Sequence, residues 1–188
     1  NAFASGYSEN SAMVAITRGL MEKLDRSELQ AVMAHELSHI RHQDIKLTMT
    51  ASILSTILLI FIDLLFYKVI FGSKRRVDGR IAFIIILLRY LLPIITTLLM
   101  LYLSRTREYM ADTGCVELMR DNQPLGRALL KIHQDHQANL TAYRTEYGQT
   151  AHEDVRRAAY LYDPVKTGAE PVKSVFSAFS THPSLEQR

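Results

Sequence analysis

Two long apolar segments constrain the fold of this chain more than any other feature. Residues 47–67 and 81–103 each contain a single charge, Asp63 in the first segment and Arg89 in the second. A helix needs about 20 apolar residues to cross the hydrocarbon core of a bilayer, and both segments reach that length. A short polar stretch, residues 72–80, separates them. The sequence therefore predicts a hydrophobic helical hairpin.

A pair of buried core helices in a soluble protein is the alternative. Apolar residues surround both segments instead of forming a stripe, and the rest of the chain is too small to enclose two such helices. A membrane hairpin over residues 47–103 is therefore favoured, and Pro93 should kink its return helix.

Asp63 and Arg89 are predicted to form an ion pair. At 1.5 Å per residue, they lie about 24 Å and about 21 Å from the base of the hairpin. Their depths match and their charges are opposite, and a lone charge in lipid is costly. The distribution of basic residues does not predict which side of the membrane the hairpin loop faces. The hairpin loop and the flanks carry four each: Lys74, Arg75, Arg76 and Arg80 against Arg41, Lys46, Arg105 and Arg107.

A second feature carries chemistry: residues 35–39 are His-Glu-Leu-Ser-His. In a helix, His35 and His39 project from the same face, so both imidazoles can bind one Zn²⁺. Glu36 is offset by about 100°, too far round to join them as a ligand. It is placed to take a proton from a water that zinc activates for attack on a peptide carbonyl. Ordinary core or surface histidines are the alternative.

The surroundings of the motif predict that it lies within a helix. Asp25 and Glu28 have the spacing of an N-cap residue and its N3 partner. Apolar residues then recur at helical spacing, namely Leu29, Val32, Met33 and Ile40.

A catalytic zinc takes three protein ligands and keeps a fourth position for water, so a third ligand is needed. Glu108 and Asp112 follow directly on the second apolar segment. A hairpin brings the chain back to where it left, so this segment should lie beside the motif helix. We predict Glu108 as the ligand and Asp112, one turn on, as the partner of a ligating histidine. A solvated glutamate is the alternative.

Length and composition set broad limits. The 188 residues make one domain, or one domain with an appendage. The net charge is +3 and the basic residues are scattered, which predicts no nucleic-acid partner. The single cysteine, Cys115, excludes an internal disulfide and should be a small buried residue. The chain begins without Met or a signal peptide, so we expect a fragment of a longer protein.

The expected fold is mainly α with a small β-hairpin, an α+β class. Strands are predicted over 1–5 and 12–17, and helices from about 26, over 104–120, from 124 to about 137, and over 151–162. The predicted parts are 1–46 with the strands and motif helix, 47–103 with the hairpin, and 104–188 with the third ligand.

The chain resembles the HtpX branch of membrane zinc metallopeptidases, which is similar to the CAAX prenyl proteases and other gluzincins. The resemblance rests on five stretches: Asn-Ala-Phe-Ala at 1–4, Val-Ala-Ile-Thr at 14–17, His-Glu-Leu-Ser-His at 35–39 with Asp44 beyond, Ser-Arg-Thr-Arg-Glu-Tyr-Met-Ala-Asp at 104–112, and Thr-His-Pro-Ser-Leu-Glu-Gln-Arg at 181–188.

This resemblance implies one zinc ion held by His35, His39 and Glu108, with Glu36 as general base. It also implies a bacterial inner-membrane protease with its active site in the cytoplasm. Such an enzyme cuts damaged or misfolded membrane proteins, so its partners are polypeptides and the lipid bilayer. The oligomeric state stays open.

Further assignments also come from the resemblance. Asp112 and Asp44 would orient the zinc ligands. His182 and Arg188 would face the cleft and stabilise the oxyanion. The strand of Asn1, Ala2, Phe3 and Ala4 would pair with extended substrate.

Two other functions are weighed against this one. The first is a processing protease with a narrow substrate, of the CAAX-protease type. The second is a membrane scaffold with a structural zinc, which would need a fourth protein ligand and no general base. The remaining histidines are expected to be surface or core residues: His42, His133, His136 and His152. The pair His133 and His136 has a spacing that can bind adventitious metal.

Overall fold

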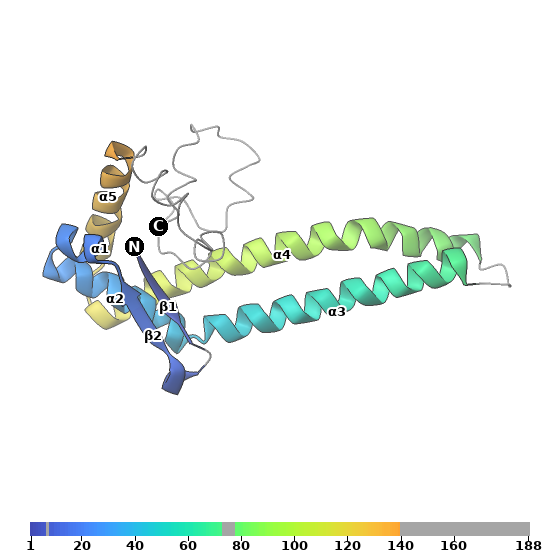
Figure 1. Cartoon of the computed structure of the whole chain (residues 1–188), viewed down its shortest axis with the longest axis horizontal. Coiled ribbons are helices and arrows are strands. Elements are labelled where there is room, and N and C mark those ends of the chain that lie inside the picture. The colour runs from blue at the N-terminus through green and yellow to red at the C-terminus, as the bar shows by residue number, and fades with distance from the viewer. Residues whose placement is uncertain (7, 73–77, 140–188) are drawn as a thin grey trace. The chain divides into compact units, whose positions relative to one another are not determined.

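The computed structural model describes residues 1–6, 8–72 and 78–139 (Figure 1). The chain divides into two compact units. One contains Asn1–Ile45 and the chain from Arg105 onward, and the other is Lys46–Ser104. The described elements are mainly helical, with one small antiparallel sheet, so the predicted fold class is confirmed.

The N-terminal strands form the predicted hairpin. β1 (Ala2–Ser5) pairs antiparallel with β2 (Met13–Ile16), and the short 3₁₀ helix η1 (Glu9–Ser11) lies between them. Gly6 follows β1 with a φ of 124°, which a residue with a side chain rarely adopts. A Cβ on Gly6 would lie 2.5 Å from the Cα atom of Ala12. The turn therefore needs glycine at this position.

The helix that carries the histidine motif, α2 (Arg26–Arg41), begins where the sequence predicts. The Asp25 carboxylate accepts a hydrogen bond from the Glu28 amide at 2.9 Å, and Glu28 Oε2 accepts one from the Asp25 amide at 3.0 Å. These bonds satisfy amides that have no partner within the helix. The short helix α1 (Arg18–Lys23) precedes them and was not predicted, although Leu20 and Leu24 are both buried at a four-residue spacing.

Ion pairs connect helix α5 (Gln123–Ala138) to the start of α2. The Lys131 ammonium donates to Glu28 Oε2 at 2.7 Å, and Arg127 Nε lies 3.8 Å from Glu28 Oε1. Glu28 itself is fully buried, so these cations compensate a carboxylate removed from water. Small and aliphatic residues fill the core between the two helices: Ala31, Val32, Leu125, Ala128 and Leu129.

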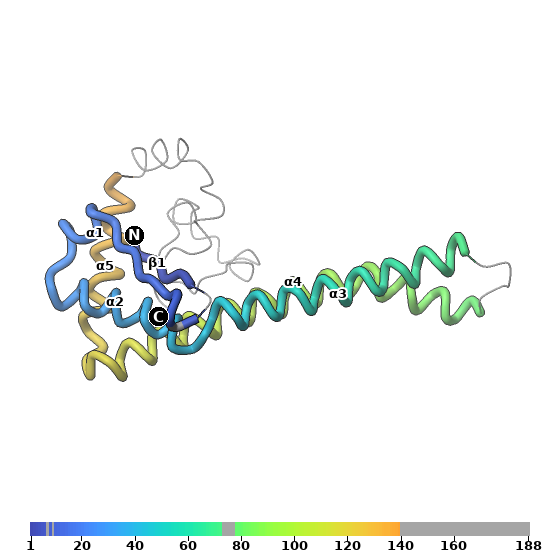
Figure 2. The backbone as a smooth tube through the Cα atoms, turned by 60° about the horizontal axis from the view of Figure 1, so that its bottom comes forward, coloured from blue at the N-terminus to red at the C-terminus, as the bar shows by residue number. Residues whose placement is uncertain are grey.

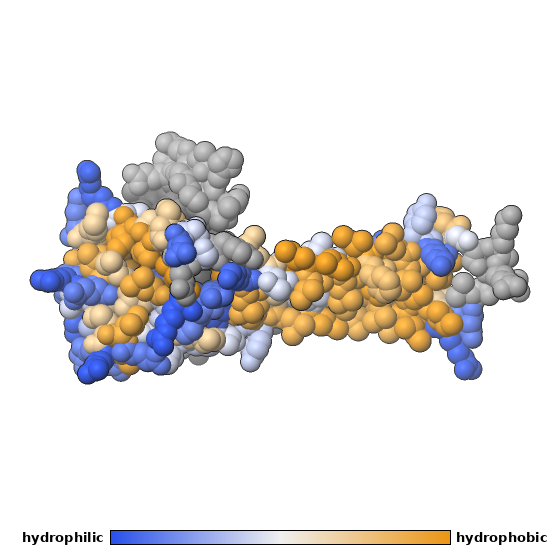
Figure 3. All heavy atoms as spheres, turned by 90° about the horizontal axis from the view of Figure 1, so that it is seen from below, coloured by the Kyte–Doolittle hydropathy of each residue, from blue (hydrophilic) through white to orange (hydrophobic). Residues whose placement is uncertain are grey.

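The second unit consists of parts of α3 (Asp44–Phe71) and α4 (Gly79–Met119), which run side by side as the predicted hairpin (Figures 1 and 2). Both helices are long and apolar enough to cross a membrane. Only 6% and 11% of their most apolar stretches are buried, which disfavours the core helices of a soluble protein. Apolar residues cover most of the face of the hairpin that is seen in Figure 3.

Two features of the hairpin bear on the sequence predictions. Arg89 Nε lies 3.1 Å from Asp63 Oδ1, so the predicted ion pair is confirmed, and the Arg89 guanidinium also lies over the Phe66 ring. The predicted helix over 104–120 is helical to Met119, but it does not begin at Ser104, because α4 runs unbroken from Gly79 through Pro93. No glycine or proline lies between Leu103 and Glu108 to end the helix there.

Candidate metal centre

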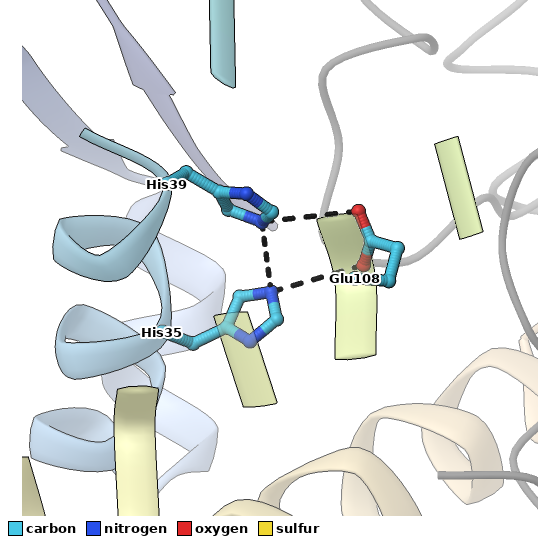
Figure 4. A group of neighbouring side chains, drawn as sticks. All are labelled: His35, His39 and Glu108. Atoms are coloured by element: carbon cyan, nitrogen blue, oxygen red, sulfur yellow. Dashed lines mark hydrogen bonds and ion pairs between the residues drawn. The ribbon is translucent and has the colours of Figure 1, made fainter. Parts of the chain in front are cut away.

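Three side chains that can bind a metal converge in the unit that contains α2. His35 and His39 project from α2 toward Glu108, which lies in the C-terminal part of α4 (Figure 4). One ligand atom from each residue lies within 4.8 Å of the others. The two histidine Nε2 atoms are 3.1 Å apart, Glu108 Oε2 lies 3.8 Å from Nε2 of His35, and Glu108 Oε1 lies 3.8 Å from Nε2 of His39.

These separations fit a zinc ion. Zinc binds imidazole nitrogen and carboxylate oxygen at about 2.0–2.2 Å, which puts two ligands of a tetrahedral ion about 3.3–3.6 Å apart. The separation of the two histidine nitrogens is slightly shorter than this range, and the two nitrogen–oxygen separations are slightly longer. Two histidines and a glutamate also form the donor set of a zinc site that keeps one position open for water.

The other ring nitrogen of each histidine faces a carboxylate. Asp112 Oδ1 lies 3.0 Å from Nδ1 of His35, and Asp44 Oδ2 lies 2.6 Å from Nδ1 of His39. A carboxylate at Nδ1 keeps the proton on that nitrogen and leaves Nε2 free to bind a metal. The structure thus places both acidic residues where the sequence predicts partners of the ligands.

Burial and the neighbouring carboxylates shift the pKa of His39 in opposite directions. Burial lowers the pKa of His39, whereas its hydrogen bond to Asp44 and the carboxylates of Glu108 and Glu36 raise it. The net effect is a raised pKa of His39. Arg107 lies behind this pair, with Nη1 donating to the Asp44 backbone oxygen at 3.5 Å and Nε 3.9 Å from Asp44 Oδ2.

Glu36 is buried, with 3% of its surface exposed, and is not part of the group of three ligand atoms. Its carboxylate is nevertheless close enough to raise the pKa of His39. This is the arrangement expected for a group that acts on a water beside the ligands without binding the metal itself.

The remaining predicted residues divide into those the structure describes and those outside it. β1, which contains Ala2, Phe3 and Ala4, pairs along one edge with β2, and within the described residues no strand pairs with its other edge. His182 and Arg188 lie outside the described residues.

The other histidines that the structure describes do not join the site. His133 contacts Gln137 at 2.9 Å, His136 is buried, and His42 is half-buried near Gly114. In the described part of the chain, three ligands meet only at His35, His39 and Glu108. His152 lies outside that part.

Two contacts at the site were missed by the sequence analysis. One joins Arg107 to Asp44, and the other brings Gly114 against Ser38. Arg107 is adjacent to a predicted ligand, which is a weak signal. Nothing in the sequence indicates the second contact, because it depends on how α2 and α4 pack.

Comparison with known proteins identifies the family. The model of peptidase family M48 matches residues 1–188. The chain belongs to this family. It is 44% identical over 189 residues to a protease HtpX homolog of Helicobacter pylori (strain Shi470), and 34% identical over 192 residues to the protease HtpX homolog 2 of Methanosarcina mazei. These matches confirm the resemblance deduced from the motifs.

The coverage of these matches is unequal. Each match covers all of the present chain, but the chain spans only 55% of the Helicobacter protein and 60% of the Methanosarcina protein. A crystal structure of Ste24p from S. mikatae has the same fold, with a TM-score of 0.58 at 22% identity. That match covers all of this chain and 40% of Ste24p.

Proposed function

We propose that this chain is the core of a zinc-dependent membrane endopeptidase. The convergence of His35, His39 and Glu108 within 4.8 Å carries this proposal, with Glu36 buried next to the first ligand. Membership of a peptidase family and identity to HtpX proteases support it.

The side chains divide the work of peptide hydrolysis. Zinc held by His35, His39 and Glu108 would polarise the scissile carbonyl and acidify a water molecule. Glu36 would take a proton from the attacking water and then return it to the leaving amine. Asp112 and Asp44 hold the imidazoles in the orientation that presents Nε2.

The strand at the N-terminus supports a mode of substrate binding. An extended peptide can add to the edge of β1 that pairs with no other described strand, through main-chain hydrogen bonds that require little side-chain specificity. Asn1, Ala2, Phe3 and Ala4 would form this edge. His182 and Arg188 would stabilise the oxyanion, as the resemblance implies.

The hairpin supports a location in a membrane. We place the enzyme in a bacterial inner membrane, with its active site facing the cytoplasm and misfolded or damaged membrane proteins as substrates. The two apolar helices and the HtpX homologues support the membrane part of this proposal. The cytoplasmic side and the role in quality control rest on the family resemblance.

A non-catalytic zinc scaffold accounts for fewer of these features. A structural zinc takes four protein ligands, whereas the described residues bring three together. A scaffold also gives no role to a buried Glu36 next to a ligand. Both observations favour the enzyme.

The metal site is tested by zinc stoichiometry in detergent-solubilised protein. We expect one zinc per chain in the wild type and a large loss of zinc in Glu108→Gln. Glu117→Gln is the matched control, because Glu117 lies on the same helix and is exposed, in an ion pair with Arg41. Full zinc retention in Glu108→Gln would show that the donor set is wrong.

A further inference from the structure

Gly114 lies where α4 crosses the histidine-bearing helix α2. A Cβ added to Gly114 would lie 2.1 Å from Ser38 Oγ and 3.0 Å from Ser38 Cβ. Its distance from His42 Cε1, 3.5 Å, would be an ordinary contact. A side chain at position 114 therefore has no room while Ser38 keeps its present conformation.

The clash with Ser38 cannot be relieved by the serine alone. Rotating the Ser38 side chain moves Oγ away but leaves Cβ in place, since α2 fixes that atom, and 3.0 Å is already tighter than an ordinary Cβ contact. Ser38 is also fully buried. Even after that rotation, Ser38 and a side chain at position 114 have to separate by a few tenths of an ångström.

The residues around Gly114 are closely packed and leave no space for that displacement. Ala111 and Cys115, on the same face of α4, are fully buried, and Cys115 Sγ donates to the Ala31 carbonyl on α2 at 3.2 Å. Small residues let helices approach closely, and interaxial distance depends on the side chains at the contact. Close-packed interiors transmit a displacement instead of absorbing it.

The contact is close to the metal ligands on both helices. Ser38 lies directly before His39 and three residues after His35. Gly114 lies six residues after Glu108, about 9 Å along the same helix. A shift of α4 at Gly114 therefore moves Glu108 relative to both histidines. Zinc–ligand distances tolerate only about 0.2 Å of deviation, so a shift of several tenths of an ångström matters.

We infer that Gly114 is a positioning residue of the metal centre, which sets the distance of Glu108 from His35 and His39 by letting α4 rest against Ser38. The inference rests on the proposed zinc site. It assigns Gly114 no contact with metal or substrate.

Helix propensity alone predicts that Gly114→Ala is favourable, whereas the contact with Ser38 predicts that it is harmful. Glycine inside a helix is less favourable than alanine, so Gly114→Ala should stabilise α4 if the contact with Ser38 were unimportant. Gly126 in α5 is the matched control, since a Cβ there meets nothing within 4 Å. Gly126→Ala should leave zinc affinity unchanged.

The test measures zinc affinity by competition with a chelator, on the detergent-solubilised chain. We expect Gly114→Ala to bind zinc at least about tenfold more weakly than the wild type, the lower end of the effect of removing an outer-shell partner. The visible spectrum of Co²⁺ bound in place of zinc should change as well, because it reports the geometry of the ligands.

A compensating variant makes the test specific. Ser38→Gly removes both atoms that a Cβ at position 114 would strike. The double variant Ser38→Gly/Gly114→Ala should therefore recover the zinc affinity and Co²⁺ spectrum of Ser38→Gly alone. This expectation also holds if Gly114→Ala by itself fails to fold.

The outcomes separate this inference from the proposed function. If the wild type binds no zinc, the proposed function fails. If the wild type binds zinc and Gly114→Ala binds it equally well, the inference alone is overturned. It is overturned too if the double variant stays as weak as Gly114→Ala, or does not fold.

Discussion

Oδ1 of Asp112 lies 3.0 Å from Nδ1 of His35, on the side of the imidazole opposite the nitrogen that faces Glu108. His35 is completely buried, so protein groups orient its ring, and the Asp112 carboxylate is the group placed at Nδ1. Asp112 lies one helical turn after Glu108. One face of α4 thus supplies both a proposed ligand, Glu108, and a carboxylate, Asp112, that contacts a second proposed ligand.

We expect Asp112→Ala to weaken zinc binding by about 10–100-fold, the usual effect of losing an outer-shell partner. Asp112→Asn should lose less, because its amide oxygen still accepts from Nδ1. Chelator competition measures both variants, with Glu117→Ala as the control on the same helix. Equal affinity in Asp112→Ala and wild type would contradict the role of Asp112.

The contacts of Asp44 predict that substitutions near His39 weaken zinc binding to different extents. Asp44→Ala removes the direct partner of His39 and should weaken zinc binding by about 10–100-fold. Arg107→Ala removes only the cation behind Asp44, so its effect should be smaller. Arg41→Ala, an exposed arginine on α2, is the control for lost charge. A larger loss of zinc affinity in Arg107→Ala than in Asp44→Ala would refute this order.

The N-cap of α2 predicts a pH dependence of stability. Hydrogen bonds from the Glu28 amide and the Ser27 hydroxyl lower the pKa of Asp25 below its ordinary value of 3.8. A lowered pKa means that ionised Asp25 stabilises the fold above that ordinary value and loses this effect as the pH falls through the lowered one.

Asp25→Ala should therefore reduce Tm at pH 7, and the difference from wild type should shrink as the pH falls below 3.8. Thermal unfolding with a chelator present isolates this effect from metal binding. Asp25→Asn, which can still cap the helix, should lose less stability at pH 7. A difference in Tm that does not vary with pH would show that the charge of Asp25 is unimportant.

The ion pair in the hairpin predicts a double-mutant result. Removing one partner leaves the other charge unpaired among apolar residues, so Asp63→Leu and Arg89→Leu should each lower Tm in lipid nanodiscs. The double variant should be more stable than either single variant, because no charge remains. If the double variant falls by the sum of the two single effects, the residues do not act as a pair.

The sequence predicted those features that depend on local spacing. The Asp25–Glu28 cap and the shared face of His35 and His39 follow from helix geometry, and the hairpin follows from the length of its apolar segments. The proximity of Glu108 to the histidines follows from topology, since a hairpin returns the chain to its starting point.

Features that depend on packing were not predicted. The contact of Arg107 with Asp44 and that of Gly114 with Ser38 require the distance and angle between two helices, which no periodicity reveals. The continuity of α4 was also missed, because a change of composition at residue 104 resembles a boundary although nothing there interrupts the helix.

The most direct test of the proposed hydrolase compares wild type with Glu36→Gln, measuring zinc content and casein cleavage in the same detergent preparations. We predict one zinc per chain in both proteins and at least about a hundredfold less cleavage in Glu36→Gln, since a general base contributes at least that factor. Equal cleavage by both proteins, or zinc without cleavage in either, would contradict the assignment of this chain as a metallopeptidase with Glu36 as its base.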